Sequence, residues 1–400
     1  MTLRRRLSQL AQSAQIGPAI ESPHERDEHS STAELPGELR QTAFGEVRVI
    51  SRRYPLDKAY GEVPLNSALK FSGETIAALA LDETLRGVDL RNALFLDTET
   101  TGLAGGTGTL PFLTGVSWFE GDELVVEQYF IEEFGRETPL LAALTERLES
   151  ASCVVTFNGK SFDWPLLRTR FVMNRLPAPP QPLHFDLLHT ARRILKRRLN
   201  SMRLVALEET VLGQRRVGDV DGAEIPEIYF HFLATGEFGR LKDVLLHNEL
   251  DLLAMPALAG WLGRQYNFVS ESDHPLDWIG VARVAERTGD LERARRFAEA
   301  AIADGRSAEA SAEGHVILAH QRHIAGDYEV EVEHLEQAAA LGVRAFEGHI
   351  HLRLAITFEH KLRCFERALS HAAYTTSEEG YLGSTKRQAR LTRRLAESRA

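Results

Sequence analysis

Residues 93–103, ALFLDTETTGL, are the stretch of sequence that decides the fold. Four apolar residues run directly into two acids that are one residue apart, Asp97 and Glu99, and the chain then reaches Gly102. A short continuous apolar run is typical of a buried central strand. Because residues i and i+2 of a strand point to the same face, both carboxylates should share one face at the end of that strand. The pair alone also fits two exposed acids at a strand end.

The flanking sequence combines strand and helix patterns. Short apolar or alternating runs, which are typical of strands, occur at residues 110–119, 123–133 and 153–158. Apolar residues recur at helical spacing in residues 139–150, 163–176, 187–199 and 241–262. Strands followed by strands that alternate with helices predict an α/β fold, a mixed sheet flanked by helices, over residues 91–265.

The two ends of the chain have a different character. Residues 1–43 are rich in Ser, Glu, His and Arg and poor in large apolar residues, so we predict a disordered tail there. Residues 44–90 form a lead-in segment, in which residues 47–54 are strand-like and residues 74–85 are helix-like. Residues 275–400 show no strand pattern, and we predict that they form a separate all-α domain.

A repeat runs through this last part of the chain. Leu291, Tyr328 and Phe365 occupy equivalent positions, separated by two intervals of 37 residues. Small or apolar residues follow them in the same register, at Ala298, Leu335 and Ala372. Helix pairs that repeat every ~34–40 residues stack into a solenoid, because one pair cannot bury its own apolar face. The pattern resembles a tetratricopeptide repeat, although the third copy lacks the Gly-Asp of the first two, and it suggests a surface for a protein partner.

The composition is that of a globular protein, 43% hydrophobic and 26% charged over 400 residues. The net charge of −10 argues against nucleic-acid binding through bulk charge but not against a local basic groove. The two cysteines, Cys153 and Cys364, have no metal-ligand spacing and indicate a reducing compartment. No apolar run approaches the length of a membrane span, so we expect a cytoplasmic protein with no membrane partner.

Two further acidic elements lie downstream. Asp163 follows the strand predicted at 153–158, at a place where an acid also serves as a helix N-cap. His247 and Asp251 are four residues apart on the helix predicted at 241–262, which puts the imidazole and the carboxylate side by side. That helix is apolar nearly all round, so an unpaired carboxylate on it would be costly. A helix cap and a satisfied His–Asp pair in the core are the structural alternatives.

The four acids together have the chemistry of a metal site. Carboxylates are hard oxygen donors that suit Mg²⁺ or Mn²⁺ rather than zinc, and no Cys/His cluster competes with them. Two such cations about 4 Å apart would stabilise both the attacking and the leaving oxygen of a phosphodiester. A neighbouring histidine could accept the proton of the attacking water.

Three motifs occur in a fixed order: DTETTGL at 97–103, NGKSFD at 158–163 and HNELD at 247–251. They resemble the three exonuclease motifs of the DEDD superfamily, which are RNase H-like 3′–5′ exonucleases. The Gly-rich LAGGTGTLPFLTG after the first motif is most similar to the YprB-like branch of ribonuclease H-like proteins, which tetratricopeptide-like repeats often follow. The resemblance covers roughly residues 91–265 and implies an RNase H-like fold.

The resemblance also implies roles for individual residues. Two divalent metal ions, Mg²⁺ or Mn²⁺, would be bound by Asp97, Glu99, Asp163 and Asp251. His247 would be the water-activating residue. The histidine-type members usually separate His and Asp by four residues and the tyrosine-type members separate Tyr and Asp by three, whereas this chain has a histidine with three. Whether His247 is the general base or only orients the water therefore stays open.

Candidate nucleic-acid contacts come from a basic run and from the motifs. The run at the end of the predicted helix, next to the proposed site, supplies Arg192, Arg193, Lys196 and Arg197. It fits a strip that contacts phosphates, and a solvated helix face is the alternative. The motifs add Leu103, Asn158 and Lys160. Asp219 and Asp221 are interpreted as turn residues.

These observations predict a metal-dependent 3′–5′ exonuclease whose substrate is single-stranded DNA or RNA. Two alternatives remain. One is a non-catalytic nucleic-acid-binding or scaffold protein that acts through its helical repeats. The other is an RNase H-like endonuclease, because this fold also cuts internally.

Overall fold

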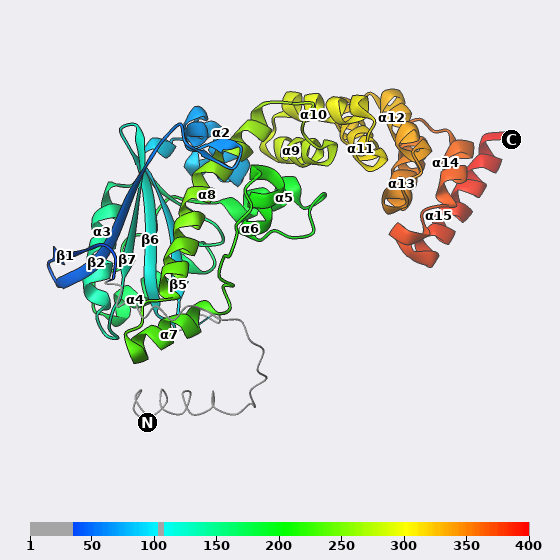
Figure 1. The fold of residues 1–400 in the computed structure, drawn as a ribbon. Helices are drawn as coiled ribbons and strands as arrows, with labels where there is room; N and C mark the ends of the chain where they lie inside the picture. Colours follow the sequence, from blue (N-terminus) through cyan, green and yellow to red (C-terminus); the bar gives the residue numbers. More distant parts are fainter. Residues whose placement is uncertain (1–34, 103–107, 400) are drawn as a thin grey trace, which may run out of the picture. The chain divides into compact units, whose positions relative to one another are not determined.

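The computed structural model describes residues 35–102 and 108–399 (Figure 1). In these residues a seven-stranded sheet has the strand order β1-β2-β7-β6-β5-β8-β9. Its strands are β1 (Glu38–Thr42), β2 (Gly45–Pro55), β5 (Ala93–Thr100), β6 (Pro111–Glu120), β7 (Glu123–Phe130), β8 (Cys153–Thr156) and β9 (His184–Asp186). Neighbours are antiparallel from β1 as far as β5 and parallel from β5 through β8 to β9. The predicted mixed sheet is confirmed.

The central strand β5 is covered on both faces. Ala93 and Phe95 belong to one hydrophobic core, and Leu94 and Leu96 belong to another. All four side chains are at most 2% exposed. Burial on both faces explains why the strand is a continuous apolar run rather than an alternating one.

Helices form a layer on each face of the sheet (Figure 1). The first core includes side chains of α2 (Gly73–Ala80), α5 (Leu187–Leu195) and α8 (Leu241–Asn267). The second core includes side chains of α3 (Glu137–Ser150), α4 (Asp163–Met173) and α7 (Ile225–Thr235). The connecting elements are β3 (Ala59–Tyr60), β4 (Val63–Pro64), η1 (Leu65–Lys70), η2 (Glu83–Leu85), η3 (Leu90–Asn92), α6 (Leu204–Leu207) and η4 (Glu208–Leu212).

The beginning of the chain differs from the prediction. The tail was predicted to span residues 1–43, but residues 38–42 form β1 and pair with β2. The segment interpreted as a lead-in, residues 44–90, contributes β2 to the main sheet. Residues 1–34 lie outside the described residues. The physical reason is that β2 pairs with β7, far downstream, and an alternating pattern does not reveal which strand will be its partner.

Every element from Pro275 to Arg399 is a helix, which agrees with the predicted all-helical C-terminal region. The helices are α9 (Pro275–Thr288), α10 (Leu291–Asp304), α11 (Ala308–Ala325), α12 (Tyr328–Ala340), α13 (Arg344–His360), α14 (Phe365–Ala372) and α15 (Thr376–Arg399). The three repeat positions are the first residues of α10, α12 and α14. Each helix packs against the next one along the chain. None of the helices in the described ranges combines the length and apolar character needed to cross a membrane.

The sheet-bearing part and the first helices of the C-terminal region share one core. That core runs from the sheet through α5 and α8 into α9, α10 and α11. A Cβ on Gly280 of α9 would lie 2.3 Å from the backbone oxygen of Ile194 in α5. The two backbones are therefore in direct contact, and the described residues group as one compact unit.

Candidate active site

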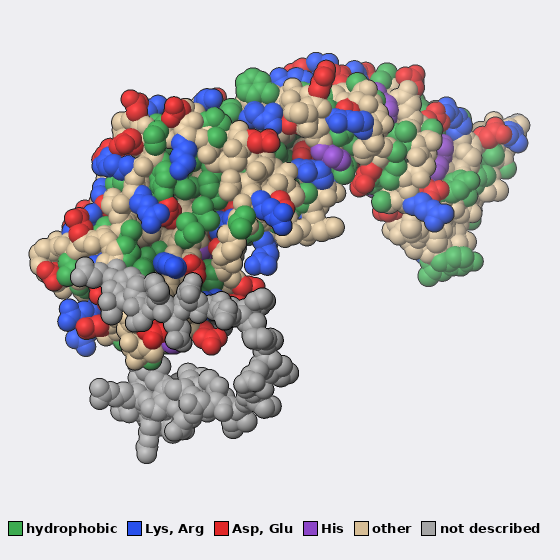
Figure 2. All heavy atoms as spheres, viewed as in Figure 1, with side chains coloured by type: hydrophobic (Ala, Val, Ile, Leu, Met, Phe, Trp, Pro, Cys, Tyr) green, Lys and Arg blue, Asp and Glu red, His purple; other side chains and the backbone are tan. Residues whose placement is uncertain are grey.

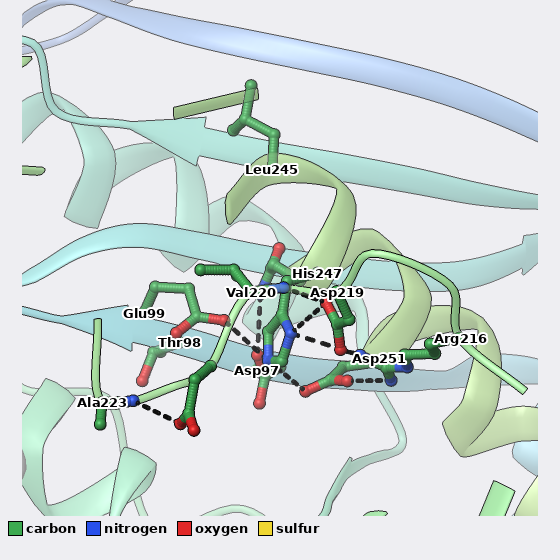
Figure 3. A network of polar contacts seen from close by, with 12 residues as sticks. Asp97, Thr98, Glu99, Arg216, Asp219, Val220, Ala223, Leu245, His247 and Asp251 are labelled. Carbon is green, nitrogen blue, oxygen red and sulfur yellow. Dashed lines mark hydrogen bonds and ion pairs between the residues drawn. The ribbon is translucent and has the colours of Figure 1, made fainter. Parts of the chain in front are cut away.

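Asp97 and Glu99 lie at the end of β5 and face α8 (Figure 3). The side-chain amide of Asn248 on α8 donates to Asp97 Oδ2 at 2.8 Å. His247, the preceding residue of α8, places its Nε2 3.9 Å from Glu99 Oε1. Both acids therefore lie on the same face of the strand, as the spacing of two residues requires.

Gly115 allows α8 to come this close to the sheet. It pairs with Asp97 in the β5–β6 ladder, and a Cβ there would lie 2.1 Å from Asn248 Oδ1. Asn248 is completely buried, and its Oδ1 accepts from Gln128 Nε2 at 2.9 Å. Sequence reasoning missed this amide pair, although a glycine inside a strand signals a close approach of another element.

Asp163 reaches the site from the other side of β5. It is the first residue of α4, and Phe162 occupies the N-cap position without a side-chain cap, so the capping alternative is wrong. Its Oδ1 accepts a hydrogen bond from Thr98 Oγ1, whose side chain points away from the α8 face. Asp163 is 5% exposed and is therefore held beside β5 with one oxygen engaged.

His247 is held by a residue that had been interpreted as a turn residue. Asp219 Oδ1 lies 2.8 Å from His247 Nδ1, and the other ring nitrogen lies 3.8 Å from Asp251 Oδ2 (Figure 3). The interpretation of Asp219 as only a turn residue is thus wrong. Asp221, by contrast, does cap the local turn, since its side chain accepts from the backbone N–H of Ala223 at 3.0 Å.

Arg216 links three acids beside this histidine. Its guanidinium donates to Asp251 Oδ1, to Asp219 Oδ2 at 3.1 Å and to Glu208 Oε2 at 2.7 Å. The Arg216 side chain is 2% exposed. Glu208 is completely buried and also accepts from Tyr60 OH at 3.1 Å. No sequence pattern singled out Arg216, because it lies in an irregular loop and two of its three acidic partners, Glu208 and Asp251, lie in other elements.

The electrostatics of the acids show that negative charge is crowded here. Burial, followed by the charges of Asp251 and Asp163, raises the pKa of Asp97 well above its usual range. Burial and then Asp97 raise the pKa of Glu99 in the same direction. Burial raises the pKa of Asp163 to about 6, although the bond from Thr98 opposes this. Either protons or a cation would relieve the repulsion.

The four predicted ligands fit a divalent cation in their chemistry, because they offer hard carboxylate oxygens. In the described residues, however, no group of three or more His, Cys, Asp or Glu side chains is arranged to hold a metal ion. One oxygen of Asp251 is engaged by Arg216 and one oxygen of Asp163 by Thr98. A bound cation would therefore be coordinated by the carboxylate oxygens that these two bonds leave free.

Comparisons with known proteins identify the family of the chain. A family model of the RNase H superfamily matches residues 94–263, which run from β5 into α8. The Bacillus subtilis (strain 168) protein named "Uncharacterized protein YprB" is 32% identical over 327 residues, which are 78% of this chain and 75% of YprB. The chain belongs to the YprB family. The RNase H-like domain and the likeness to YprB are thus confirmed. RNase H superfamily members usually use divalent metals.

In this member of the YprB family, the NGKSFD motif forms a loop anchored by Asp186. Asp186 accepts from the backbone N–H groups of Asn158 at 2.9 Å and Lys160 at 3.1 Å. Asn158 has a φ of 71°, which asparagine tolerates better than most residues. Lys160 Nζ lies 3.8 Å from Asp82 Oδ2. Leu103, another candidate contact, lies outside the described residues.

The sequence predicts the basic run next to the acids, but the structure places it elsewhere. It lies at the C-terminal end of α5 and faces α9 and α11 of the helical region. Arg197 pairs there with Glu313 of α11, at 2.8 Å between Nε and Oε2. The error arose because sequence gives the spacing of the cations along α5 but not the elements that this helix will meet.

Proposed function

We propose that this chain is a metal-dependent 3′–5′ exonuclease that hydrolyses phosphodiester bonds of single-stranded DNA or RNA. The observation that carries the proposal is the meeting of Asp97 and Glu99 with His247 and Asp251 at the end of β5. Asp163 lies on the opposite side of the same strand end. Membership of the RNase H superfamily makes a nuclease-like activity the natural expectation.

Two divalent ions would be held by Asp97, Glu99, Asp163 and Asp251. When bound, such ions polarise the phosphate and lower the pKa of an attacking water. Asn248 keeps Asp97 turned toward α8, and Thr98 keeps Asp163 beside β5. Both bonds restrict the carboxylate rotamers before any cation arrives, which lowers the entropy lost on binding.

His247 would accept the proton of the attacking water at Nε2. This nitrogen lies 3.9 Å from Glu99 and 3.8 Å from Asp251, beyond hydrogen-bond reach of both. The carboxylate oxygen of Asp219 would accept the Nδ1–H, and a neutral imidazole would then have its lone pair on Nε2, the atom that faces the acids. Asp219 is therefore a positioning residue, and Arg216 in turn holds Asp219.

The helical region is proposed to be a tetratricopeptide-like array. The three residues spaced by 37 each begin the second helix of a pair, and the residues seven positions later are fully buried. A regular array of this kind offers an extended surface for a protein partner. That partner remains a prediction.

The activity is tested with 5′-labelled single-stranded DNA and RNA in Mg²⁺ or Mn²⁺. Wild type should produce a ladder that shortens from the 3′ end, and Asp97→Asn should abolish it. Asp122→Asn is the matched control, because Asp122 lies exposed in the β6–β7 turn. This variant should cleave like wild type.

The other outcomes identify the alternatives. Internal cuts that disappear in Asp97→Asn would replace the exonuclease with an endonuclease. Binding of the strands without cleavage in either metal would refute the nuclease and favour a scaffold. Cleavage that persists in Asp97→Asn would point to a contaminating enzyme.

A further inference from the structure

A basic cavity of about 860 Å³ lies where α5 meets α9 and α11. We refer to it as the junction cavity, because its walls come from both the sheet-bearing part and the helical region. It is lined mainly by six Lys or Arg side chains, together with Glu286, Glu313 and His320. Figure 2 shows Lys and Arg side chains over α5 and α9 on this side of the molecule.

The junction cavity concentrates positive charge in an acidic protein. Six Lys or Arg side chains and two Glu side chains line it, which leaves a formal charge of +4, whereas the whole chain carries −10. Local charge of the opposite sign to the net charge is a feature that bulk composition does not explain.

Both glutamates of the junction cavity are already engaged. Glu313 pairs with Arg197 at 2.8 Å and with Arg283 at 3.0 Å. Glu286 pairs with Arg283 at 2.9 Å and with His320 at 3.1 Å. The other four cations of the cavity form no ion pair with an acid of residues 35–102 or 108–399: Arg192, Arg193, Lys196 and Arg287.

Two of the guanidinium groups repel each other across the cavity. Arg193 of α5 donates to the backbone oxygen of Leu79 at 3.1 Å, and burial and then the charge of Arg287 lower its pKa. The two helices are held together, because side chains of α5 and α9 belong to the same hydrophobic core. The fold thus fixes like charges near one another, an arrangement that a bound anion would stabilise.

We propose that the junction cavity binds the phosphate backbone of the single strand whose 3′ end lies at the acids. The inference rests on the proposed function and extends it to a second contact region that neither half of the chain forms alone. Arginine side chains bind phosphate oxygens in bidentate fashion, and five of the six cations are arginines. His320 is the one ring among the lining residues, so backbone contacts, rather than base stacking, would dominate.

The position of the cavity sets a length requirement. Helix α5 has nine residues and leads away from the edge of the sheet at which β9 ends. A rise of about 1.5 Å per residue and strand spacings of about 4.8 Å place the cavity on the order of 15 Å from the acids. At about 3.4 Å per stacked nucleotide, a strand needs roughly five nucleotides to reach it.

The test measures binding without metal, so that it does not depend on cleavage. Fluorescein-labelled oligothymidylates and oligouridylates of 3 to 12 nucleotides are titrated in EDTA with wild type and with Lys196→Gln/Arg287→Gln. The control is Arg344→Gln/Lys386→Gln, which removes the same charge from exposed side chains outside the cavity. Circular dichroism and thermal unfolding verify that both double variants are folded.

In wild type, affinity should rise by about tenfold or more between 3 and 8 nucleotides. In Lys196→Gln/Arg287→Gln this rise should be lost, and the slope of log affinity against log salt for the 12-mer should become shallower by about 1.4, since each lost phosphate contact removes ~0.7. The control variant should behave like wild type.

Three results separate the proposals. Equal affinities and salt slopes for both double variants would overturn the junction site, even if wild type is an exonuclease. If wild type cleaves no substrate but binding is lost in Lys196→Gln/Arg287→Gln, the junction site would be supported and the proposed exonuclease activity would be overturned. Displacement of the 12-mer by poly-glutamate as effectively as by unlabelled 12-mer would overturn the assignment to phosphate and favour an acidic protein segment.

Discussion

Replacement of Arg216 by methionine is expected to destabilise the protein more than any other single loss of charge described above. The guanidinium is 2% exposed and contacts Glu208, Asp219 and Asp251. Methionine keeps a flexible chain of similar length but has no donor for these carboxylates. The substitution therefore isolates the charge from the volume of the side chain.

The magnitude follows from the burial of each partner. Glu208 is completely buried, and without Arg216 its side-chain partner in the described residues is the hydroxyl of Tyr60. Breaking a buried ion pair and leaving one charge behind costs about 3–5 kcal/mol. Asp219 and Asp251 are each 16% exposed, so water and a bound cation can compensate them in part. We expect a loss of ~3–5 kcal/mol, a large fraction of a typical folding free energy of ~5–15 kcal/mol.

Urea unfolding in EDTA, followed by circular dichroism, measures this loss. The matched control is Arg215→Met, because Arg215 is the next residue, its side chain is 82% exposed, and its nearest acid, Glu209, lies 4.0 Å away. The control should change the free energy of unfolding by less than about 0.5 kcal/mol. Adding Glu208→Gln to Arg216→Met should restore part of the stability, because it removes the uncompensated charge.

Equal unfolding free energies for Arg216→Met and Arg215→Met would show that the buried ion pairs of Arg216 do not stabilise the fold. If Glu208→Gln destabilised the Arg216→Met background as strongly as it destabilises wild type, Glu208 and Arg216 would not be coupled.

Three further predictions concern other parts of the molecule. Asp219→Asn should lower kcat by about 10- to 100-fold with little change in KM, because His247 loses the carboxylate that orients it; an unchanged kcat in steady-state assays would remove Asp219 from the mechanism. Gly115→Ala should lower stability in thermal unfolding by ~1–3 kcal/mol, because its Cβ would overlap a side chain of α8, whereas Gly87→Ala meets open space and should be tolerated. Burial lowers the pKa of His184 to about 4, whereas the unfolded state has an ordinary pKa near 6.5 and therefore gains the proton first as pH falls. The free energy of unfolding should be constant above about pH 7 and drop by up to ~3 kcal/mol toward pH 4. In urea unfolding, His184→Gln should flatten that pH dependence.

Local sequence patterns predicted the elements that carry the site. The apolar run before Asp97 required a central strand, and the helical spacing around His247 required a buried helix, as the structure has them. The period of 37 residues also located the starts of α10, α12 and α14. These features depend on neighbours within one strand, one helix or one repeat, so the chain itself contains the information.

Most of the contacts that the sequence did not reveal join distant segments. Asp219 looked like a turn residue because the histidine that it holds lies in another element. Arg216 lies in a loop without periodicity, and β2 pairs with β7, which lies far downstream in the chain. The basic run of α5 was assigned to the wrong neighbourhood for the same reason. Spacing defines which side chains share a helix face, but packing decides what that face meets.

Helix α11 belongs to two cores at once, and this affects how the protein would yield to force. Ile317 and Leu318 pack into the core shared with the sheet, whereas Val316 and Ala319 pack into the core of the last helices. A pull applied to the C-terminal helices would peel them away in steps of low force as far as α11. Extracting α11 itself would open the core that supports β5, so the next step should require a distinctly larger force and should release the sheet-bearing part in one event.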